Sequence, residues 1–588
     1  MQEEIKKLIK DALIDLGIED VAFAVEHPDD MKNGDYSTNA AMVCSKREKA
    51  NSKELAEKIV RKINEKKPEK IDRIEVAGAG FINFYLSRDF FGHSIEKILN
   101  DGNNVGKNAS LSGQKIMIEY TDPNPFKPFH IGHLMTNSIG ESIARIMEHS
   151  SADVSRANYQ GDIGLHVAKA IYGMLEKDLN SFADISKEKI FEFLRKIHNC
   201  IDSNDMARYV GDCYVFGSNA YDTDEKAKAA IDDINKKIYE RSDQKINEIY
   251  DWGFEVTMDA FENIYRLLGT KFDYYFLESA MADIGKDIVV ANKHKIFEES
   301  DGALVFHAEK YDPKLHTRVF VASSGLPTYE AKELGLATEK IKTEPDMNLS
   351  VIITANEQAE YMKVVAKAIS LIDMPAYKNC RTMHITHGMM RLSSGKMSSR
   401  KGNIITGESL LRDTIDLVKD KIKDREWEEE DKRAIADSVG VAAIKYSILK
   451  QDTGGDIIYD FENSISFEGD SGPYLQYSYA RANSVLEKAQ NENILPDFEQ
   501  KPGEVFEVEK MLYRFDEIVL RSVSEYEPHY IANYLVDVAR AYNSFYGNNV
   551  IVHKDDPYSP YKIAMTYAFS FVMKTGLHLL GIEAPRKM

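Results

Sequence analysis

The 588-residue sequence has little cysteine and no long apolar run, and both absences limit what the protein can be. Its four cysteines include no C-x-x-C pair, which argues against a disulfide framework and a structural zinc site. Cys200 and Cys213 could approach each other, but buried thiols are the simpler expectation. No apolar stretch is as long as a membrane span, and the polar start Met-Gln-Glu-Glu-Ile-Lys-Lys lacks the apolar core of a secretion signal. We therefore expect a protein of the reducing cytoplasm that does not enter a membrane.

Positively charged residues are also fewer than negatively charged ones. There are 75 Lys and Arg against 95 Asp and Glu, so the net charge is −20. This excess of acid argues against a protein that coats nucleic acid through bulk electrostatics, although it leaves room for a local basic track. A hydrophobic content of 43% with 29% charged residues is ordinary for a globular protein. The length predicts three or four domains with large cores.

Hydrophobic periodicity divides the chain into three parts and predicts a multidomain α/β protein. Residues 1–108 alternate helical patterns with one long strand-like stretch, 75–86, and are expected to form an N-terminal α+β domain. Residues 109–430 are expected to form a doubly wound, Rossmann-type domain. Residues 431–588 are helical almost throughout and predict an all-α domain.

The central part begins with a strand over 116–120, a helix after residue 133 and a second strand over 154–159. That order predicts a parallel sheet whose ligand lies outside the carboxyl ends of the strands. A charged helical insertion, around 166–300, interrupts the alternation. Strand signals then return at residues 303–306, 319–321 and 351–353.

The loop Asp122-Pro-Asn-Pro-Phe-Lys-Pro-Phe-His-Ile-Gly-His133 joins the first strand to the first helix. A helix N-terminus offers unpaired N–H groups to phosphate, Gly132 allows close approach, and His130 and His133 can donate hydrogen bonds. Two histidines three residues apart are usually ordinary surface or core residues. The strand before them, the helix after them and Lys127 upstream favour a nucleotidyl-transfer site instead.

A second element, Ser393-Ser-Gly-Lys-Met-Ser-Ser-Arg-Lys-Gly-Asn403, combines small residues, hydroxyls and three cations. A loop of this kind can close over a triphosphate and stabilise the charge that develops on a leaving pyrophosphate. Taken alone it is equally typical of a solvated Ser/Gly loop. Its pairing with the histidine loop favours the functional interpretation.

The two elements resemble the HIGH and KMSKS signatures of class I aminoacyl-tRNA synthetases, in His130-Ile-Gly-His133 and Lys396-Met-Ser-Ser-Arg400. Neighbouring segments narrow the resemblance to the arginyl-tRNA synthetase family, and it covers essentially the whole chain. These segments are Gly161-Asp-Ile-Gly164, Gly325-Leu-Pro-Thr-Tyr-Glu-Ala-Lys-Glu333, Glu468-Gly-Asp-Ser-Gly-Pro-Tyr-Leu-Gln-Tyr-Ser-Tyr-Ala-Arg481 and Val538-Ala-Arg-Ala-Tyr-Asn-Ser-Phe-Tyr546.

The resemblance implies an arginine–tRNA ligase that activates L-arginine with ATP and transfers it to the 3′-terminal adenosine of tRNA(Arg). It assigns catalysis to His130, His133, Lys127 and Lys396, and ATP binding to these four together with Gly132, Ser398 and Arg400. Mg²⁺ would accompany ATP without a dedicated protein cage. A monomer is expected by family analogy.

The family's arginine-binding residues fall on Glu119, Asn124, Tyr329, Glu333 and Gln358. Glu119 and Glu333 suit the guanidinium, which needs acceptors in a matching fork, whereas Asn124 and Gln358 suit the amino-acid head group. Asp162 is a weaker candidate for the substrate amine, because Gly-Asp-x-Gly is also ordinary turn chemistry.

Two positions depart from the family pattern. Ser399 stands where the second lysine of KMSKS is usual, and the resemblance implies that Lys127 takes over the role of that cation. Glu333 stands where the family commonly has Asp, which puts the strength of arginine binding in doubt.

The helical C-terminal part resembles the family's anticodon-binding domain, in which exposed aromatic rings could stack on unpaired bases. For most of Tyr474, Tyr477, Tyr530 and Tyr542, however, a place in the core is the simpler expectation. Three alternatives stay open: a class I synthetase for another amino acid, a small HxGH nucleotidyltransferase, and an inactive tRNA-binding paralogue. A small HxGH nucleotidyltransferase needs only one compact domain, and the length of this chain argues against it. The third predicts loss of His130, His133 or Lys396, and all three are present.

Overall fold

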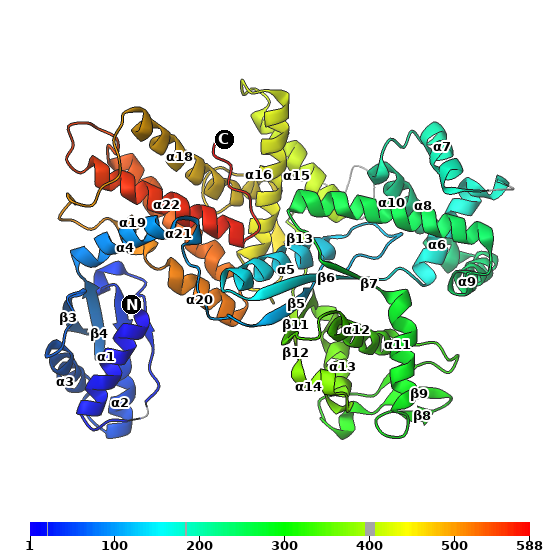
Figure 1. Cartoon of the computed structure of the whole chain (residues 1–588), viewed down its shortest axis with the longest axis horizontal. Coiled ribbons are helices and arrows are strands. Elements are labelled where there is room, and N and C mark those ends of the chain that lie inside the picture. Colours follow the sequence, from blue (N-terminus) through cyan, green and yellow to red (C-terminus); the bar gives the residue numbers. More distant parts are fainter. Residues whose placement is uncertain (20, 183–184, 394–405) are drawn as a thin grey trace.

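The computed structural model describes residues 1–19, 21–182, 185–393 and 406–588 (Figure 1). The predicted architecture is confirmed: an N-terminal α+β unit, a central parallel sheet with a helical insertion, and a helical C-terminal part. Within the described residues, no helix is both long and apolar enough to cross a membrane.

The N-terminal unit is a four-stranded antiparallel sheet, ordered β1-β2-β4-β3, with helices packed against it. Residues 75–86 form a hairpin and not one strand, because Gly78 and Gly80 turn the chain with positive φ. The unit docks on the C-terminal helices, where Glu517 accepts hydrogen bonds from Tyr36 and the Gln2 backbone. Its elements are α1 (Gln2–Asp15), β1 (Val25–Glu26), β2 (Tyr36–Thr38), α2 (Ala40–Glu48), α3 (Ser52–Asn64), β3 (Ile71–Ala77), β4 (Phe81–Leu86) and α4 (Arg88–Asp101).

The central sheet is parallel and five-stranded, with strand order β12-β11-β5-β6-β7. The predicted strands over 303–306 and 319–321 lie outside it, in an antiparallel sheet of β8 (Glu298–Ser300), β9 (Ala303–Phe306) and β10 (Arg318–Val321). Two of the five strands, β7 and β12, are not predicted from the sequence. The five are β5 (Lys115–Glu119), β6 (Asp153–Gln160), β7 (Tyr274–Leu277), β11 (Leu349–Ala355) and β12 (Arg381–His387).

Alternation along β5 divides its side chains between two helical layers. Ile116 and Ile118 face the core that contains α5 (Ile131–His149), whereas Met117 faces α11 and α12. Glu119, two residues after Met117, therefore projects to the α12 side at the carboxyl end of the strand. The helices on that side are α11 (Glu278–Ala291), α12 (Tyr329–Thr343), α13 (Ala359–Leu371) and α14 (Pro375–Asn379).

Five helices between β6 and β7 form the insertion and have a hydrophobic core of their own. Glycines bring two of them into backbone contact, because a Cβ on Gly173 or Gly217 would overlap the backbone of the facing helix. The insertion lies to one side of the sheet in Figure 1. It comprises α6 (Leu165–Lys177), α7 (Lys187–Ile197), α8 (Ser203–Thr223), α9 (Glu225–Glu240) and α10 (Gln244–Leu268).

The C-terminal part is helical and shares one continuous core with α5. A short parallel pair, β13 (Met390–Leu392) and β14 (Ile457–Tyr459), joins it to the central part. The domain boundaries after residues 108 and 430 stay predictions, since α4 packs on α22 and α16 spans the second boundary. The helices are α15 (Gly407–Ile422), α16 (Glu429–Leu449), α17 (Phe461–Ser464), α18 (Gly472–Asn491), α19 (Glu507–Leu512), α20 (Phe515–Glu525), α21 (His529–Asn548) and α22 (Ser559–Leu579).

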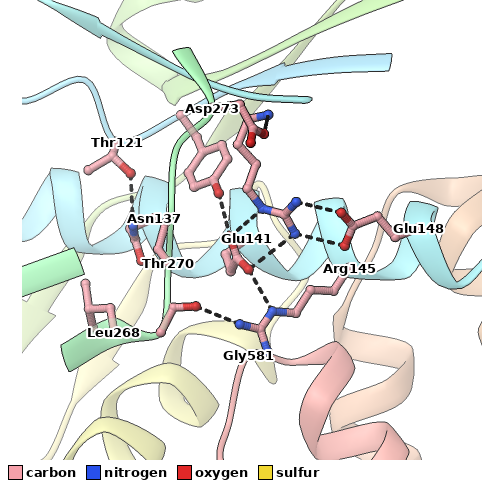
Figure 2. A network of polar contacts seen from close by, with 12 residues as sticks. Thr121, Asn137, Glu141, Arg145, Glu148, Leu268, Thr270, Asp273 and Gly581 are labelled. Carbon is pink, nitrogen blue, oxygen red and sulfur yellow. Dashed lines mark hydrogen bonds and ion pairs between the residues drawn. The ribbon is translucent and has the colours of Figure 1, made fainter. Parts of the chain in front are cut away.

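A polar network connects the buried middle of α5 to the central sheet, the insertion and the C-terminal helices (Figure 2). Glu141, 3% exposed, accepts hydrogen bonds from Tyr120 Oη at 2.5 Å, Arg145 Nε at 2.7 Å and Arg156 Nε at 3.0 Å. Arg145 also donates to the carbonyl oxygens of Gly269 and His578, at the ends of the insertion and of α22. The helix that carries the two histidines is thus held by the sheet, the insertion and the C-terminal helices together.

A further buried cation completes this network. Lys445 on α16 is inaccessible to solvent and donates to Leu268 O at 2.6 Å and Gly581 O at 2.8 Å. Burial, with the nearby charge of Arg145, lowers the pKa of Lys445 to about 7. Gly581 has a positive φ, and a Cβ there would lie 2.8 Å from Lys445 Nζ, so a side chain at this position would be strained and would press on the ammonium.

Replacing Glu141 with Gln should lower the free energy of unfolding by about 3 kcal/mol, because two mostly buried guanidinium groups lose their shared counter-ion. Denaturant unfolding measures the change. Glu148→Gln is the matched control: Glu148 also pairs with Arg156 but its side chain is 41% exposed, so the loss should stay below about 1 kcal/mol. Equal losses in the two variants would contradict the central place of Glu141.

Candidate active site

The predicted histidine pair caps the N-terminus of α5. His130 is the N-cap residue and its Nδ1 accepts the backbone N–H of His133 at 3.3 Å, while His133 Nδ1 accepts the backbone N–H of His130 at 3.2 Å. The two rings stack with centroids 3.3 Å apart. Because each Nδ1 is an acceptor, the ring hydrogen of each neutral imidazole resides on Nε2, where it can be donated to a ligand.

The electrostatic surroundings keep both rings neutral. Loss of hydration and the nearby Lys127 ammonium lower the pKa of His130 to about 4. Burial, His130 and Lys127 together hold the pKa of His133 well below its usual range. At neutral pH the site therefore offers two uncharged N–H donors beside the free amides of the helix N-terminus.

Gly132 makes room for a neighbouring ring as well as for a ligand. A Cβ at this position would lie 3.0 Å from His130 Cε1 and 3.1 Å from its Nδ1. A side chain there would press on the ring that caps the helix. The requirement for glycine therefore includes the geometry of the histidine pair itself.

Lys127 lies half-buried just before the histidines, with its Nζ 5.6 Å from the centre of the Tyr214 ring on α8. Burial and the nearby Lys169 lower the pKa of Lys127. The loop that carries it is bent, because Thr121, Asp122 and Phe126 all have positive φ. Strain of this kind at three non-glycine residues is typical of a loop shaped for function.

The predicted residues Lys396, Ser398 and Arg400 lie outside the described residues. The chain on both sides of them is placed, however. Ser393 donates to Asp460 Oδ2 at 3.0 Å, and Gly407 N donates to Phe129 O at 2.8 Å next to a bridge between Thr406 and His130. The chain that follows this segment therefore lies against the histidine loop at residues 406 and 407.

Five carboxylates gather at the carboxyl end of the sheet. Three are buried: Glu119 at the end of β5, Asp162 after β6 and Glu278 at the start of α11. Asp122 and Glu333 are partly exposed and can reach a ligand. Loss of hydration and the Glu119 charge raise the pKa of Glu333 to about 8 and raise that of Asp122 well above its usual range.

Two lysines of α12 neutralise two of the buried carboxylates. Lys340 forms an ion pair with Glu119, and Lys332 forms one with Glu278. Asp162 is held differently, by hydrogen bonds from the Ser279 backbone at 2.9 Å and from its hydroxyl at 2.6 Å. Of the residues that the structure describes, no cation forms an ion pair with Glu333 or Asp122.

The remaining predicted residues lie around this cluster. Asn124 lies against Gly161, where a Cβ would overlap its Oδ1. Tyr329, 68% exposed, begins α12. Gln358 is exposed and accepts a hydrogen bond from Tyr361 Oη at 3.2 Å; the same hydroxyl lies 3.5 Å from Glu333 Oε1. Tyr361 thus connects two of the predicted residues.

The sequence interpretation missed several polar residues of this site. Lys340, Glu278 and Tyr361 carry no motif, and only their position in the fold brings them to the cluster. Tyr159 follows the alternation of β6, and its buried hydroxyl has no hydrogen-bond partner within the described ranges. A polar residue at the end of a predicted parallel strand was the one signal that could have revealed it.

A cavity of about 580 Å³ lies in the C-terminal helical part. Trp427 and Tyr477 line it, and two guanidinium groups lie over their rings: Arg425 at 5.6 Å from the Trp427 centroid and Arg481 at 4.8 Å from the Tyr477 centroid. The expectation that most of the four tyrosines are core residues is wrong: Tyr542 alone is buried, while Tyr474 and Tyr477 line this cavity and Tyr530 is partly exposed.

Comparison with known proteins agrees with this arrangement. The family model for the catalytic domain of class I (R) tRNA synthetases matches residues 94–461, the DALR anticodon-binding domain matches 475–588, and the arginyl tRNA synthetase N-terminal domain matches 3–86. The arginine–tRNA ligase of Clostridium perfringens is 29% identical, covering 99% of this chain and all of the relative. That of Halothermothrix orenii is 28% identical, covering 100% and 99%.

Two solved structures share the fold over the whole chain. Thermus thermophilus arginyl-tRNA synthetase superposes with a TM-score of 0.78 at 22% identity and covers all of both chains. The Plasmodium falciparum enzyme gives 0.76 at 19% identity, covering 100% of this chain and 99% of the other. Since the catalytic-domain model alone spans more than half of the sequence, the chain belongs to the class I (R), or arginyl, tRNA synthetase family.

Proposed function

We propose that this protein is an arginine–tRNA ligase. The observation that carries the proposal is the group of carboxylates at the carboxyl end of the sheet, of which Glu333 and Asp122 are partly exposed and form no ion pair with a cation of the described ranges. Glu119 and Asp122 lie on the same strand–loop–helix unit as the two neutral histidines, and Glu333 on α12 lies beside them. A cationic amino acid and the phosphates of ATP thus find opposite kinds of partners in one site.

The first step joins the arginine carboxylate to the α-phosphate of ATP, with pyrophosphate as the leaving group. His130 and His133 would donate their Nε2 hydrogens to phosphate oxygens, and Gly132, Lys127, Lys396, Ser398 and Arg400 would complete the ATP site. The protein acts by positioning the reactants and stabilising charge, and needs no covalent intermediate. Mg²⁺ would enter with ATP and be held mainly by phosphate and water.

For arginine, Glu333 and Glu119 would accept from the guanidinium, with Tyr329 beside it. Asn124 and Gln358 would bind the amino-acid head group. The Tyr361 hydroxyl, 3.5 Å from Oε1 of Glu333, would help to hold this longer carboxylate in place. In the second step a ribose hydroxyl of the terminal adenosine attacks the arginyl carbonyl and AMP leaves.

We assign tRNA(Arg) to the C-terminal cavity through its unpaired anticodon bases. Aromatic faces with guanidinium groups over them are suited to stacking of single-stranded bases. Since the net charge is −20, binding depends on such local groups and not on the protein's overall field. We further propose a cytoplasmic enzyme that acts as a monomer, with the domain divisions after residues 108 and 430.

ATP–pyrophosphate exchange with each amino acid, with and without tRNA, tests the function. We expect exchange that responds to arginine and needs tRNA. Exchange with another amino acid would indicate a different synthetase, and no exchange under any condition would indicate an inactive paralogue.

Replacing Lys127 with Ala should lower the adenylation rate about 100-fold, because it removes the cation that substitutes for the one absent at Ser399. The KM values for arginine and ATP should stay within about threefold. Lys177→Ala is the control, since this lysine also lies over an aromatic ring, Phe216, but on the exposed side of the insertion. An unchanged rate in the Lys127 variant would remove this residue from the catalytic set.

Replacing Tyr477 with Ala should raise the KM for tRNA about tenfold, which corresponds to the loss of one stacked base at about 1–3 kcal/mol. Exchange at saturating tRNA should be unaffected. Tyr558→Ala, a change of a 40% exposed tyrosine that does not line the cavity, serves as control. If both variants charge tRNA with wild-type KM, the cavity is not the base-binding site.

A further inference from the structure

Lys340 occupies an unusual place for a lysine: it is 2% exposed and its ammonium is paired with Glu119, itself 3% exposed and one of the proposed arginine ligands. An ammonium in this position costs hydration energy, which only a close counter-ion offsets. The substrate guanidinium must therefore enter a pocket in which one carboxylate already has a resident cation.

The contact is made through one edge of the carboxylate. Lys340 approaches Glu119 Oε2, which leaves Oε1 as the oxygen that can accept from a ligand. Glu333, on the same helix two turns earlier, forms no ion pair with any cation that the structure describes and is partly exposed. The groups that face this pair are Asp122 and Tyr159 from the sheet side, Glu278 and Lys332 from α11 and α12, Tyr361 from α13 and His384 from β12.

We propose that Lys340 is the resident counter-ion of Glu119 and thereby a specificity-determining positioning residue of the arginine pocket. This rests on the proposed function. Glu119 then acts as a neutralised hydrogen-bond acceptor for one edge of the guanidinium, and Glu333 provides the carboxylate that balances its charge. A guanidinium has five N–H donors in a plane and can contact both groups at once.

The same arrangement discriminates against lysine. The compact ammonium of a substrate lysine can pair with Glu333 but finds the second carboxylate position occupied, because the Lys340 ammonium already holds that place on Glu119. Removing Lys340 would vacate it. Lys340 therefore favours a planar, multi-donor cation over a point charge.

The test is the KM for arginine in ATP–pyrophosphate exchange with the full-length protein. Glu119→Gln leaves the Lys340 ammonium buried without a counter-ion beside the guanidinium, and should raise the arginine KM at least 100-fold with the ATP KM within threefold. Adding Lys340→Met to that variant removes the stranded cation and should restore at least tenfold of the loss.

The matched control is Lys332→Met in the Glu119→Gln background. Lys332 is also a buried lysine of α12 in an ion pair, but its partner is Glu278, so no recovery of the arginine KM is expected. Equal recovery in both double variants, no recovery in either, or an unchanged arginine KM in Glu119→Gln would each overturn the proposal.

A second measurement tests the proposal if the Glu119→Gln variant does not fold. Lys340→Met alone should lower the ratio of kcat/KM for arginine over lysine at least tenfold, whereas Lys340→Arg should keep it, because the cavity of about 70 Å³ beside this residue admits a larger cation. An unchanged ratio in Lys340→Met contradicts the role of Lys340. Wild-type exchange that does not respond to arginine would instead refute the proposed function.

Discussion

The active site depends on one constraint, the cost of holding acidic side chains away from water at the carboxyl end of the central sheet. The fold meets it with cations from a single helix, because Lys332 and Lys340 of α12 pair with Glu278 and Glu119. Of the cluster's carboxylates in the described part of the chain, Glu333 and Asp122 form no ion pair with a lysine and are partly exposed. A cationic substrate supplies the counter-charge that lets Glu333 ionise, and this accounts for the choice of arginine better than any one contact does.

The helix α5 connects this site to the rest of the molecule. Its N-terminus carries the stacked histidines, and its buried middle carries Glu141, which is held by arginines from α5 itself and from β6 (Figure 2). Arg145 and Lys445 extend the contacts to the insertion and to the chain after α22. The same rigid element thus presents the phosphate-binding groups and anchors the helical domain, which keeps the histidines in one geometry.

Much of this could be predicted from the sequence. The strand–loop–helix unit around His130 and the parallel sheet follow from local periodicity and turn chemistry, and both are as predicted. Residues 75–86 were mistaken for one strand because two glycines were not taken as a turn. Strand β7 was not predicted because it is short and follows a long helical insertion. The role of Lys340 was not predicted because its partner Glu119 lies on a distant strand. Ion pairs between distant segments leave no pattern in a single sequence.

Proton release on arginine binding tests the charge balance most directly. Burial raises the pKa of Glu333 from 4.5 to about 8, so at pH 7 the empty site holds this proton, and a bound guanidinium favours the ionised form and expels it. Titration calorimetry with arginine and tRNA, in buffers of different ionisation enthalpy, counts the protons. The account predicts release of about one proton at pH 7 and very little at pH 9, where Glu333 is already ionised. No release at pH 7, or equal release at both pH values, would contradict it.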